Sequence, residues 1–199
     1  LTDYSIGWAL PGWKNTLNLL KNKDNFSKND ILRAGLIKQK EGAGENSFYD
    51  RFRERIIFPL QDIHGNLIAF AGRVITETEP KYLNSPETPL YIKGKHLFGF
   101  NRAKESIRKQ NRALIVEGYF DQMRAHQSGI RNSVATCGTA LTLEQANLLK
   151  NHTNRATLIF DSDSAGQAAT KKGFEVLLKQ GLSVEVLSLP AGHDPDSFI

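Results

Sequence analysis

The 199-residue sequence predicts an α/β protein, α+β overall, in which a mixed subdomain with a β-hairpin precedes a mainly parallel sheet flanked by helices. From residue 112 onward, short apolar runs alternate with stretches of helical length, which is the pattern of a parallel sheet covered on both faces. The charge changes near the same point. Residues 1–108 contain 17 basic and 12 acidic side chains, whereas residues 109–199 contain 9 of each. We therefore expect two subdomains, residues 1–108 and 109–199.

The sequence of the first subdomain predicts few regular elements. Turn residues at 62–66 separate two apolar runs, which predicts a β-hairpin with strands at residues 56–61 and 67–74. Short helices are expected at residues 28–34 and 102–109. Residues 80–89 contain three prolines, so we expect no regular structure there. The net charge of +5 favours an anionic partner. All of the excess positive charge lies in this subdomain, so we expect this subdomain to contact that partner.

The second subdomain predicts alternating strands and helices. Strands are expected at residues 114–116, 132–135, 158–160 and 184–189. Helices are expected at residues 119–127, 142–150 and 165–180. Gly129 and Gly181 follow the first and third of these helices, and Thr142-x-x-Gln145 has the spacing of a capping box at the start of the second. No run of 18 apolar residues is present, so no membrane partner is expected.

Acidic side chains follow three of the four expected strands. They are Glu117 and Asp121, Asp161 and Asp163, and Asp194 and Asp196, and they account for six of the nine acidic residues after residue 108. The carboxyl ends of parallel strands meet at one edge of a sheet, where sites form. Converging carboxylates repel one another unless cations lie among them. A structural reading stays open for each pair, since Asp between a strand and a helix is often an N-cap or turn residue.

The composition limits the kind of metal. A single cysteine, Cys137, excludes an intramolecular disulfide, and five scattered histidines give no cluster for zinc. We therefore expect oxygen ligands, which favour Mg²⁺ or its substitute Mn²⁺, and no zinc in this part of the protein. Cys137 is expected to be a small buried residue, and Trp8 and Trp13 are expected to pack against the first core.

Three acidic motifs resemble those of the TOPRIM domain, which has a Rossmann-like sheet. The motifs are EGYFD at 117–121, FDSDSAG at 160–166 and GHDPD at 192–196. Four upstream motifs resemble the N-terminal half of the catalytic core of bacterial DnaG-type primases. They are RFRERIIFPL at 51–60, AGR at 71–73, PKYLNSPET at 80–88 and YIKGKHLFG at 91–99. Family members commonly have GGR and DGD where this chain has AGR and DSD, and neither change removes a charge.

The resemblance implies a DNA-directed RNA polymerase that makes short RNA primers on single-stranded DNA during replication, by metal-dependent nucleotidyl transfer. It implies that Glu117, Asp161 and Asp163 are the principal metal ligands. Asp121, Asp194 and Asp196 would complete the acidic crevice, and Glu117 is a candidate general base. The catalytic residues implied in this way are Glu117, Asp121, Asp161 and Asp163.

The same resemblance implies that four residues bind nucleotides or nucleic acid: Arg73, Lys81, Tyr82 and Lys93. The partners implied are a single-stranded DNA template, the RNA primer and ribonucleoside triphosphates. Arg51, Arg53 and Arg55 either extend this basic surface or belong to a solvated face, and the sequence leaves both readings open.

Further expectations concern the parent protein. The chain resembles a C-terminally truncated piece of a larger cytoplasmic enzyme, without the zinc module that precedes such cores. Contact with the replicative helicase is expected through a region outside this sequence. Two alternatives stay open, namely another TOPRIM enzyme such as a nuclease or topoisomerase, and a fragment that binds nucleic acid without catalysis.

Overall fold

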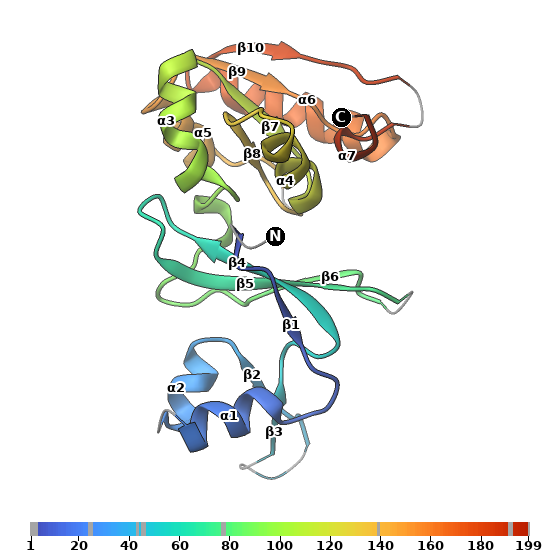
Figure 1. Ribbon diagram of the computed structural model, residues 1–199. Helices are drawn as coiled ribbons and strands as arrows, with labels where there is room; N and C mark the ends of the chain where they lie inside the picture. Colours follow the sequence, from blue (N-terminus) through green and yellow to red (C-terminus); the bar gives the residue numbers. More distant parts are fainter. Residues whose placement is uncertain are drawn as a thin grey trace. The chain divides into compact units, whose positions relative to one another are not determined.

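The computed structural model describes residues 4–23, 26–42, 44, 47–76, 79–138, 140–190 and 193–198. The chain forms two compact units. The first unit comprises Leu1–Leu60 and Leu67–Ile92, and the second comprises Gln61–Asn66 and Lys93–Ile199 (Figure 1). The division after Ile92 precedes the expected boundary at residue 108, because the last helix of the expected first subdomain belongs to the second unit.

A four-stranded sheet forms the centre of the first unit, with strand order β1-β4-β5-β6. Its strands are β1 (Gly7–Ala9), β4 (Arg55–Gln61), β5 (Leu67–Val74) and β6 (Tyr82–Asn84). The expected hairpin is β4 and β5, whose turn is closed where the Asp62 amide donates to the Asn66 carbonyl at 2.9 Å. Strand β6 runs antiparallel to β5, with Arg73 opposite Tyr82. The expectation of no regular structure at residues 80–89 is therefore wrong, because a short edge strand lies between the prolines.

A small layer of helices and strands completes the first unit. Its members are α1 (Asn15–Lys23), α2 (Lys28–Arg33), β2 (Ile37–Gln39) and β3 (Phe48–Asp50). Leu17, Ile31 and Ile37 form its core. The buried carboxylate of Asp50 accepts hydrogen bonds from the amides of Thr16 and Leu17 at 2.7 and 3.0 Å, which satisfies amides in the first turn of α1.

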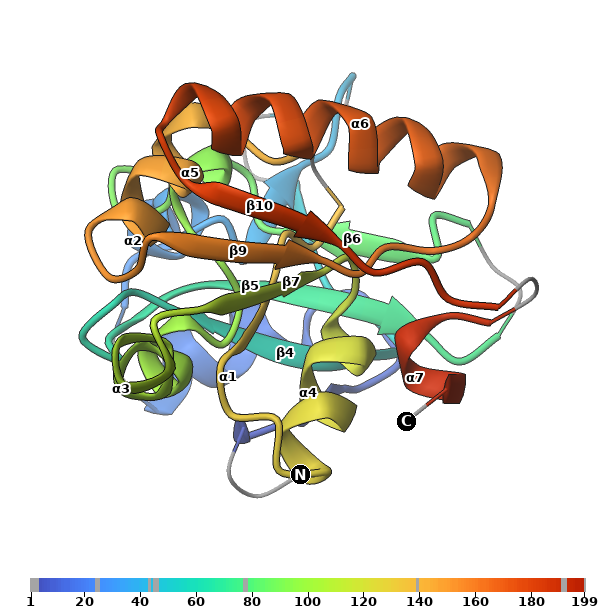
Figure 2. The same cartoon turned by 90° about the horizontal axis from the view of Figure 1, so that it is seen from above.

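The second unit is an α/β layer structure, as the sequence predicts. Its strands are β7 (Ala113–Val116), β8 (Ser133–Ala135), β9 (Arg155–Leu158) and β10 (Ser183–Val186). They lie in the order β10-β9-β7-β8, and each neighbouring pair among them is parallel. Helices α5 (Leu143–Lys150) and α6 (Ser164–Lys179) cover one face, and α3 (Phe100–Gln110) and α4 (Tyr119–Gln127) cover the other (Figure 2). The short elements η2 (Lys93–Lys95) and α7 (Pro195–Phe198) complete it.

The core of this unit fixes the position of the strand ends. Ile115, Val134 and Leu158 on the central strands are fully buried between the two helical layers. The predicted capping box at α5 is confirmed, since Thr142 and Gln145 exchange side-chain to backbone hydrogen bonds of 3.1 Å. Because the strands are parallel, β7, β8 and β9 end at the same edge of the sheet. Among the helices described, none is long and apolar enough to cross a membrane.

Candidate active site

Glu117 and Asp161 lie side by side at the ends of neighbouring strands. Glu117 directly follows β7, and its Oε1 accepts a hydrogen bond from the backbone amide of Asp161 at 3.1 Å. Asp161 follows β9, the strand that pairs with β7. Its own Oδ1 is buried and has no hydrogen-bond partner. A buried carboxylate oxygen without a donor is costly, so this atom suits a cation ligand better than a purely structural role.

The carboxylate of Asp121 is buried and holds two segments together. It lies in the first turn of α4, where its Oδ2 accepts from the amide of Gly118 at 2.9 Å. Its Oδ1 accepts from the amide of Asp196, in the first turn of α7, at 3.1 Å. The first and third acidic pairs of the sequence are thus joined by a direct hydrogen bond. Both oxygens of Asp121 are engaged with backbone amides.

Two further carboxylates cap helices, as the structural reading of such residues predicts. Asp163 is the N-cap of α6, and its Oδ1 accepts from the amide of Gly166 at 2.7 Å. Asp194 accepts from the amide of Ser197 at 2.8 Å at the start of α7. The side chain of Asp196 is exposed. The GHDPD motif begins at Gly192, which lies outside the described residues.

Burial, with a further contribution from neighbouring carboxylates, raises the pKa of three of these acids. Burial raises the pKa of Glu117, and the charges of Asp161, Asp163 and Asp121 raise it further against the hydrogen bond from the Asp161 amide. Burial raises the pKa of Asp121 to about 6, with Asp161 and Asp194 adding to the shift. Burial also raises the pKa of Asp161, again with help from Asp194 and Asp163. Together with the hydrogen bonds that join Glu117 to the Asp161 amide and Asp121 to the Asp196 amide, this places members of all three acidic pairs near the strand ends.

The donor set fits a hard divalent cation in its chemistry, because it consists of carboxylate oxygens, one of them buried without a partner. Within the described ranges, however, no three His, Cys, Asp or Glu side chains are arranged closely enough to form a coordination group. The capping hydrogen bonds of Asp121, Asp163 and Asp194 explain this, since they direct carboxylate oxygens toward backbone amides. The described residues therefore supply oxygen ligands of the right kind, but they are not already arranged around one coordination site.

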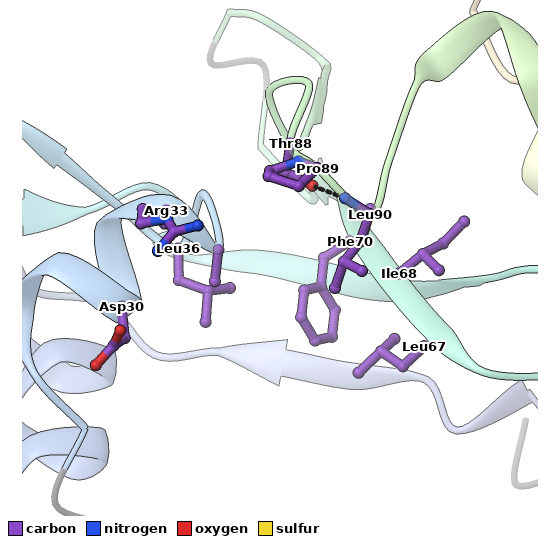
Figure 3. Close-up of a pocket in the computed structure, with 11 residues that line it drawn as sticks. Asp30, Arg33, Leu36, Leu67, Ile68, Phe70, Thr88, Pro89 and Leu90 are labelled. Atoms are coloured by element: carbon purple, nitrogen blue, oxygen red, sulfur yellow. Dashed lines mark hydrogen bonds between the residues drawn. The ribbon is translucent and has the colours of Figure 1, made fainter.

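A pocket of about 350 Å³ adjoins the acidic cluster. Asp161 and Ser162 line it together with the polar side chains of Gln167, Thr170 and Ser188. A second pocket, of about 580 Å³, lies within the first unit and is largely apolar, with Leu36, Phe70 and Leu90 among its lining residues (Figure 3). Only the first of these two pockets contains a member of the acidic cluster.

The four basic and aromatic residues expected to bind nucleotides are divided between the units. Arg73, Lys81 and Tyr82 lie together in the first unit, where the Arg73 guanidinium carbon is 5.6 Å from the centre of the Tyr82 ring. Lys93 lies in η2 of the second unit. Burial raises the pKa of the Cys137 thiol. The nearby Asp121 carboxylate raises this pKa further, and the nearby Lys93 ammonium lowers it. Lys93 therefore lies near the edge of the sheet where the carboxylates gather.

Sequence reasoning did not find the separate roles of Arg51, Arg53 and Arg55, which lie before and at the start of β4. Arg55 is buried and Arg51 donates twice to one backbone carbonyl, so neither is simply part of a solvated face. The Arg53 guanidinium carbon lies 4.5 Å from the centre of the Trp13 ring. Trp13 is 64% exposed and Trp8 is 43% exposed, so the expectation that both tryptophans pack against the core is wrong. Cys137 is buried, as expected.

Two protein families match the chain, and together they account for both units. The family described as the N-terminal domain of the DNA primase catalytic core matches residues 1–104. A Toprim-like family matches residues 114–199. The chain belongs to the DNA primase family, with the catalytic core fold of DnaG primases. Its Toprim-like part indicates divalent-metal binding in general.

Named relatives and solved structures agree with this assignment. The DNA primase of Clostridium acetobutylicum is 44% identical over 197 residues, which cover 98% of this chain and 32% of the relative. A DNA primase domain from Pseudomonas aeruginosa is 41% identical with a TM-score of 0.89, covering 98% of this chain and 61% of that one. A DnaG primase catalytic domain bound to single-stranded DNA is 38% identical with a TM-score of 0.85, and the coverage is again 98% and 61%. The chain thus spans about a third of the length of the curated relatives that it matches.

Proposed function

We propose that the whole protein synthesises short RNA primers on single-stranded DNA by metal-dependent nucleotidyl transfer. The observation that carries this proposal is the cluster of mutually repelling carboxylates at the carboxyl ends of parallel strands in a chain of the primase family. A polymerase that joins nucleotides needs a site that attracts divalent cations and, with them, a triphosphate. The buried and unpartnered Oδ1 of Asp161 supports that role for this cluster.

Each acidic residue has a proposed part in the site. Glu117, Asp161 and Asp163 hold Mg²⁺, or Mn²⁺ in its place, and Asp121, Asp194 and Asp196 complete the acidic surroundings. When bound, the ions lower the pKa of the attacking 3′-hydroxyl and stabilise the pyrophosphate that leaves. Glu117 is also the proposed general base. Its burial raises its pKa, which brings a carboxylate closer to the range in which it accepts a proton efficiently.

The basic residues have a different proposed task. Arg73, Lys81 and Lys93 contact the phosphates of the incoming ribonucleoside triphosphate, the template or the RNA primer, and Tyr82 stacks on a base. Residues 1–108 thus supply contacts to nucleic acid, and residues 109–199 supply the metal site. The whole protein is proposed to work in the cytoplasm and to meet the replicative helicase through a region outside this sequence.

The test is primer synthesis from the four ribonucleotides on a single-stranded template, with the whole protein and Mg²⁺. Glu117→Gln and Asp161→Asn keep the size of each side chain and remove its charge, so each should lower the product yield by orders of magnitude. Glu105→Gln on the exposed face of α3 removes the same charge away from the site and should leave the yield unchanged. Wild-type yield from both site variants would refute the proposed function.

The same proteins also separate primer synthesis from the other activities left open by the sequence. A nuclease or topoisomerase would cut labelled DNA with Mg²⁺ and no nucleotide, and a non-catalytic module would bind DNA without changing it. The proposal predicts incorporation of ribonucleotides and intact template. Cleavage that depends on Asp161, without any incorporation, would replace this proposal with a nuclease function.

A further inference from the structure

Arg55, the first residue of β4, is a buried cation that donates hydrogen bonds to two backbone segments of the first unit. It is only 7% exposed. Its Nη1 donates to the carbonyl of Pro80 at 2.9 Å and to those of Gly72 and Lys81 at 3.4 Å. Gly72 precedes Arg73 on β5, while Pro80 and Lys81 lead into β6. The guanidinium therefore ties together the two backbone segments that carry Arg73, Lys81 and Tyr82.

Gly72 leaves the space that this arrangement needs. A Cβ atom at Gly72 would lie 3.0 Å from Cδ of Arg55 and 2.9 Å from Cδ1 of Phe52. Both distances are at or below the closest approach that such atoms normally make. The stem of Arg55 thus passes directly against the backbone of β5, beside Arg73. The close fit fixes the path of the side chain as well as its end.

Arg51 holds the far end of the same segment. Its Nε and Nη2 donate to the carbonyl of Asn84, the last residue of β6, at 3.0 and 2.6 Å. Burial lowers the pKa of both Arg51 and Arg55, as expected for cations withdrawn from water. Arg55 thus holds the backbone just before β6 by hydrogen bonds, and Arg51 holds its last residue.

Such support matters because β6 is a weak element by itself. It has three residues and lies at the edge of its sheet. Few ladder hydrogen bonds hold a strand of this length, and Pro80 has no amide to add another. Hydrogen bonds from a charged donor are about twice as strong as neutral ones. The positions of Lys81 and Tyr82 thus depend on the arginines as well as on β5.

We propose that Arg55 and Arg51 are positioning residues, which hold Lys81 and Tyr82 beside Arg73 in the arrangement that receives phosphate groups. This inference rests on the proposed function of that trio. The long arginine side chain brings Nη1 of Arg55 within reach of three carbonyls, and the planar guanidinium of Arg51 donates to one carbonyl from both Nε and Nη2. The ammonium of lysine is instead a single point of charge on a shorter, flexible stem. Lysine should therefore be a poor substitute at either position, although it keeps the charge.

The test uses the whole protein and compares Arg55→Lys, Arg55→Gln, Arg51→Lys and Lys81→Gln with the double variant Arg55→Lys/Lys81→Gln. Two quantities are measured: amide hydrogen exchange of residues 81–85, and the kcat and KM of primer synthesis for ribonucleotides. Arg55→Lys should speed exchange of residues 81–85 about tenfold, the effect expected for loss of one charge-assisted hydrogen bond. Exchange in the second unit should not change.

In the same variant KM should rise severalfold while kcat changes little, and the rise should disappear when Lys81 is already Gln. Arg108→Gln, an exposed change in α3, is the control and should match the wild type in every measurement. If Arg55→Gln fails to fold, Arg55→Lys and Arg51→Lys decide the question through the same measurements.

Three results would overturn the inference. One is unchanged exchange of residues 81–85 in both lysine variants, and another is an unchanged KM. The third is a rise in KM that persists in the Lys81→Gln background, which would mean that Arg55 acts by another route. Failure of the proposed function gives a different result: the wild type would then make no primer, whereas failure of the role of Lys81 alone would leave Lys81→Gln at the wild-type level. In both cases the exchange of residues 81–85 still reports on the arginines.

Discussion

Gly166 sets how closely α6 approaches the two carboxylates at the strand ends. A Cβ atom there would lie 2.2 Å from the carbonyl oxygen of Asp161 and 2.9 Å from Oε1 of Glu117. Neither neighbour can withdraw easily, because one is backbone and the other accepts the Asp161 amide. Gly166→Ala should therefore lower the free energy of unfolding by about 1–3 kcal/mol, the usual cost of overpacking. Urea unfolding measures it.

Gly173→Ala, in the same helix, is the matched control. A Cβ at Gly173 would meet Leu158 at 3.5 Å, an ordinary van der Waals distance. Alanine favours a helix by about 1 kcal/mol over glycine, so this variant should be as stable as the wild type or more stable. If both variants lose equal stability, the close approach at Gly166 does not limit the stability of the fold.

His126 makes stability depend on pH, because it is a buried base. Burial lowers its pKa to about 4, and Arg131 and Arg102 act in the same direction against the hydrogen bond to the Ser133 carbonyl. The unfolded chain binds a proton at this residue below pH of about 6.5, whereas the folded chain does not until about pH 4. Acidification through this window therefore favours unfolding, by on the order of 1 kcal/mol at pH 5.5.

Comparison with His126→Gln, which keeps an N–H donor, isolates this effect. The raised pKa values of Glu117, Asp121 and Asp161 act in the opposite direction, since the folded chain then binds more protons than the unfolded one, and they are common to both proteins. The variant should lose about 1 kcal/mol less than the wild type between pH 7.5 and 5.5 in urea unfolding. Equal losses would show that His126 is not the group responsible.

At the scale of single elements, the start of α5 depends on a side-chain network. Gln145 accepts from the amide of Thr142 and also donates from Nε2 to the carbonyl of His96 at 2.7 Å. Gln145 is fully buried, so its replacement leaves polar groups without partners. Gln145→Ala should cost about 1–3 kcal/mol of stability, as measured by thermal unfolding. Asn147→Ala, at an exposed position of the same helix, should stay within about 0.5 kcal/mol of the wild type.

The sequence predicts those elements that carry a strong local signal. The strands and helices of the second unit fall within a few residues of their expected positions, because buried parallel strands are continuous apolar runs and their helices have capping residues. Strands β1, β2, β3 and β6 escape prediction, since three residues are too few to show an alternating pattern. The short strand β6 is stabilised by hydrogen bonds from Arg51 and Arg55, which lie about 30 positions away in the sequence. A local sequence pattern cannot show such bonds.

The same limit applies to the candidate site. The carboxylates at the strand ends follow from the strand pattern alone, and their convergence is visible in the structure. Nothing local in the sequence distinguishes a buried Arg55 from an exposed arginine, because its burial depends on Gly72 and the approach to β6. The additional capping role of Asp163 was open as an alternative, and only the contact with the Gly166 amide reveals it.

At the scale of the whole molecule, the net charge of +5 conceals an acidic cluster whose repulsion a cation would relieve. Mg²⁺ should therefore stabilise the folded protein, by about 1.4 kcal/mol when its concentration is tenfold above the dissociation constant. A rise in melting temperature upon addition of Mg²⁺ measures this gain. The gain should be much smaller in Asp161→Asn, which keeps the shape of the side chain and loses its charge.

Glu105→Gln, whose carboxylate lies on exposed α3, controls for the general effect of removing one negative charge. It should gain as much from Mg²⁺ as the wild type does. Equal gains in all three proteins would place the stabilising ion away from Asp161. Addition of a chelator should return each protein to its starting melting temperature.

The hydrogen bond from the Asp196 amide to Asp121 spans 75 positions of sequence. It joins α7 to the first turn of α4, which follows strand β7. Local opening of α7 would leave a buried carboxylate oxygen of Asp121 without a donor. The free-energy cost of losing this hydrogen bond opposes fraying of α7. We therefore expect α7 and the start of α4 to open and close together as one cooperative folding unit. This hydrogen bond stabilises the four-residue helix α7, so Asp121 and Asp196 should share a single local stability.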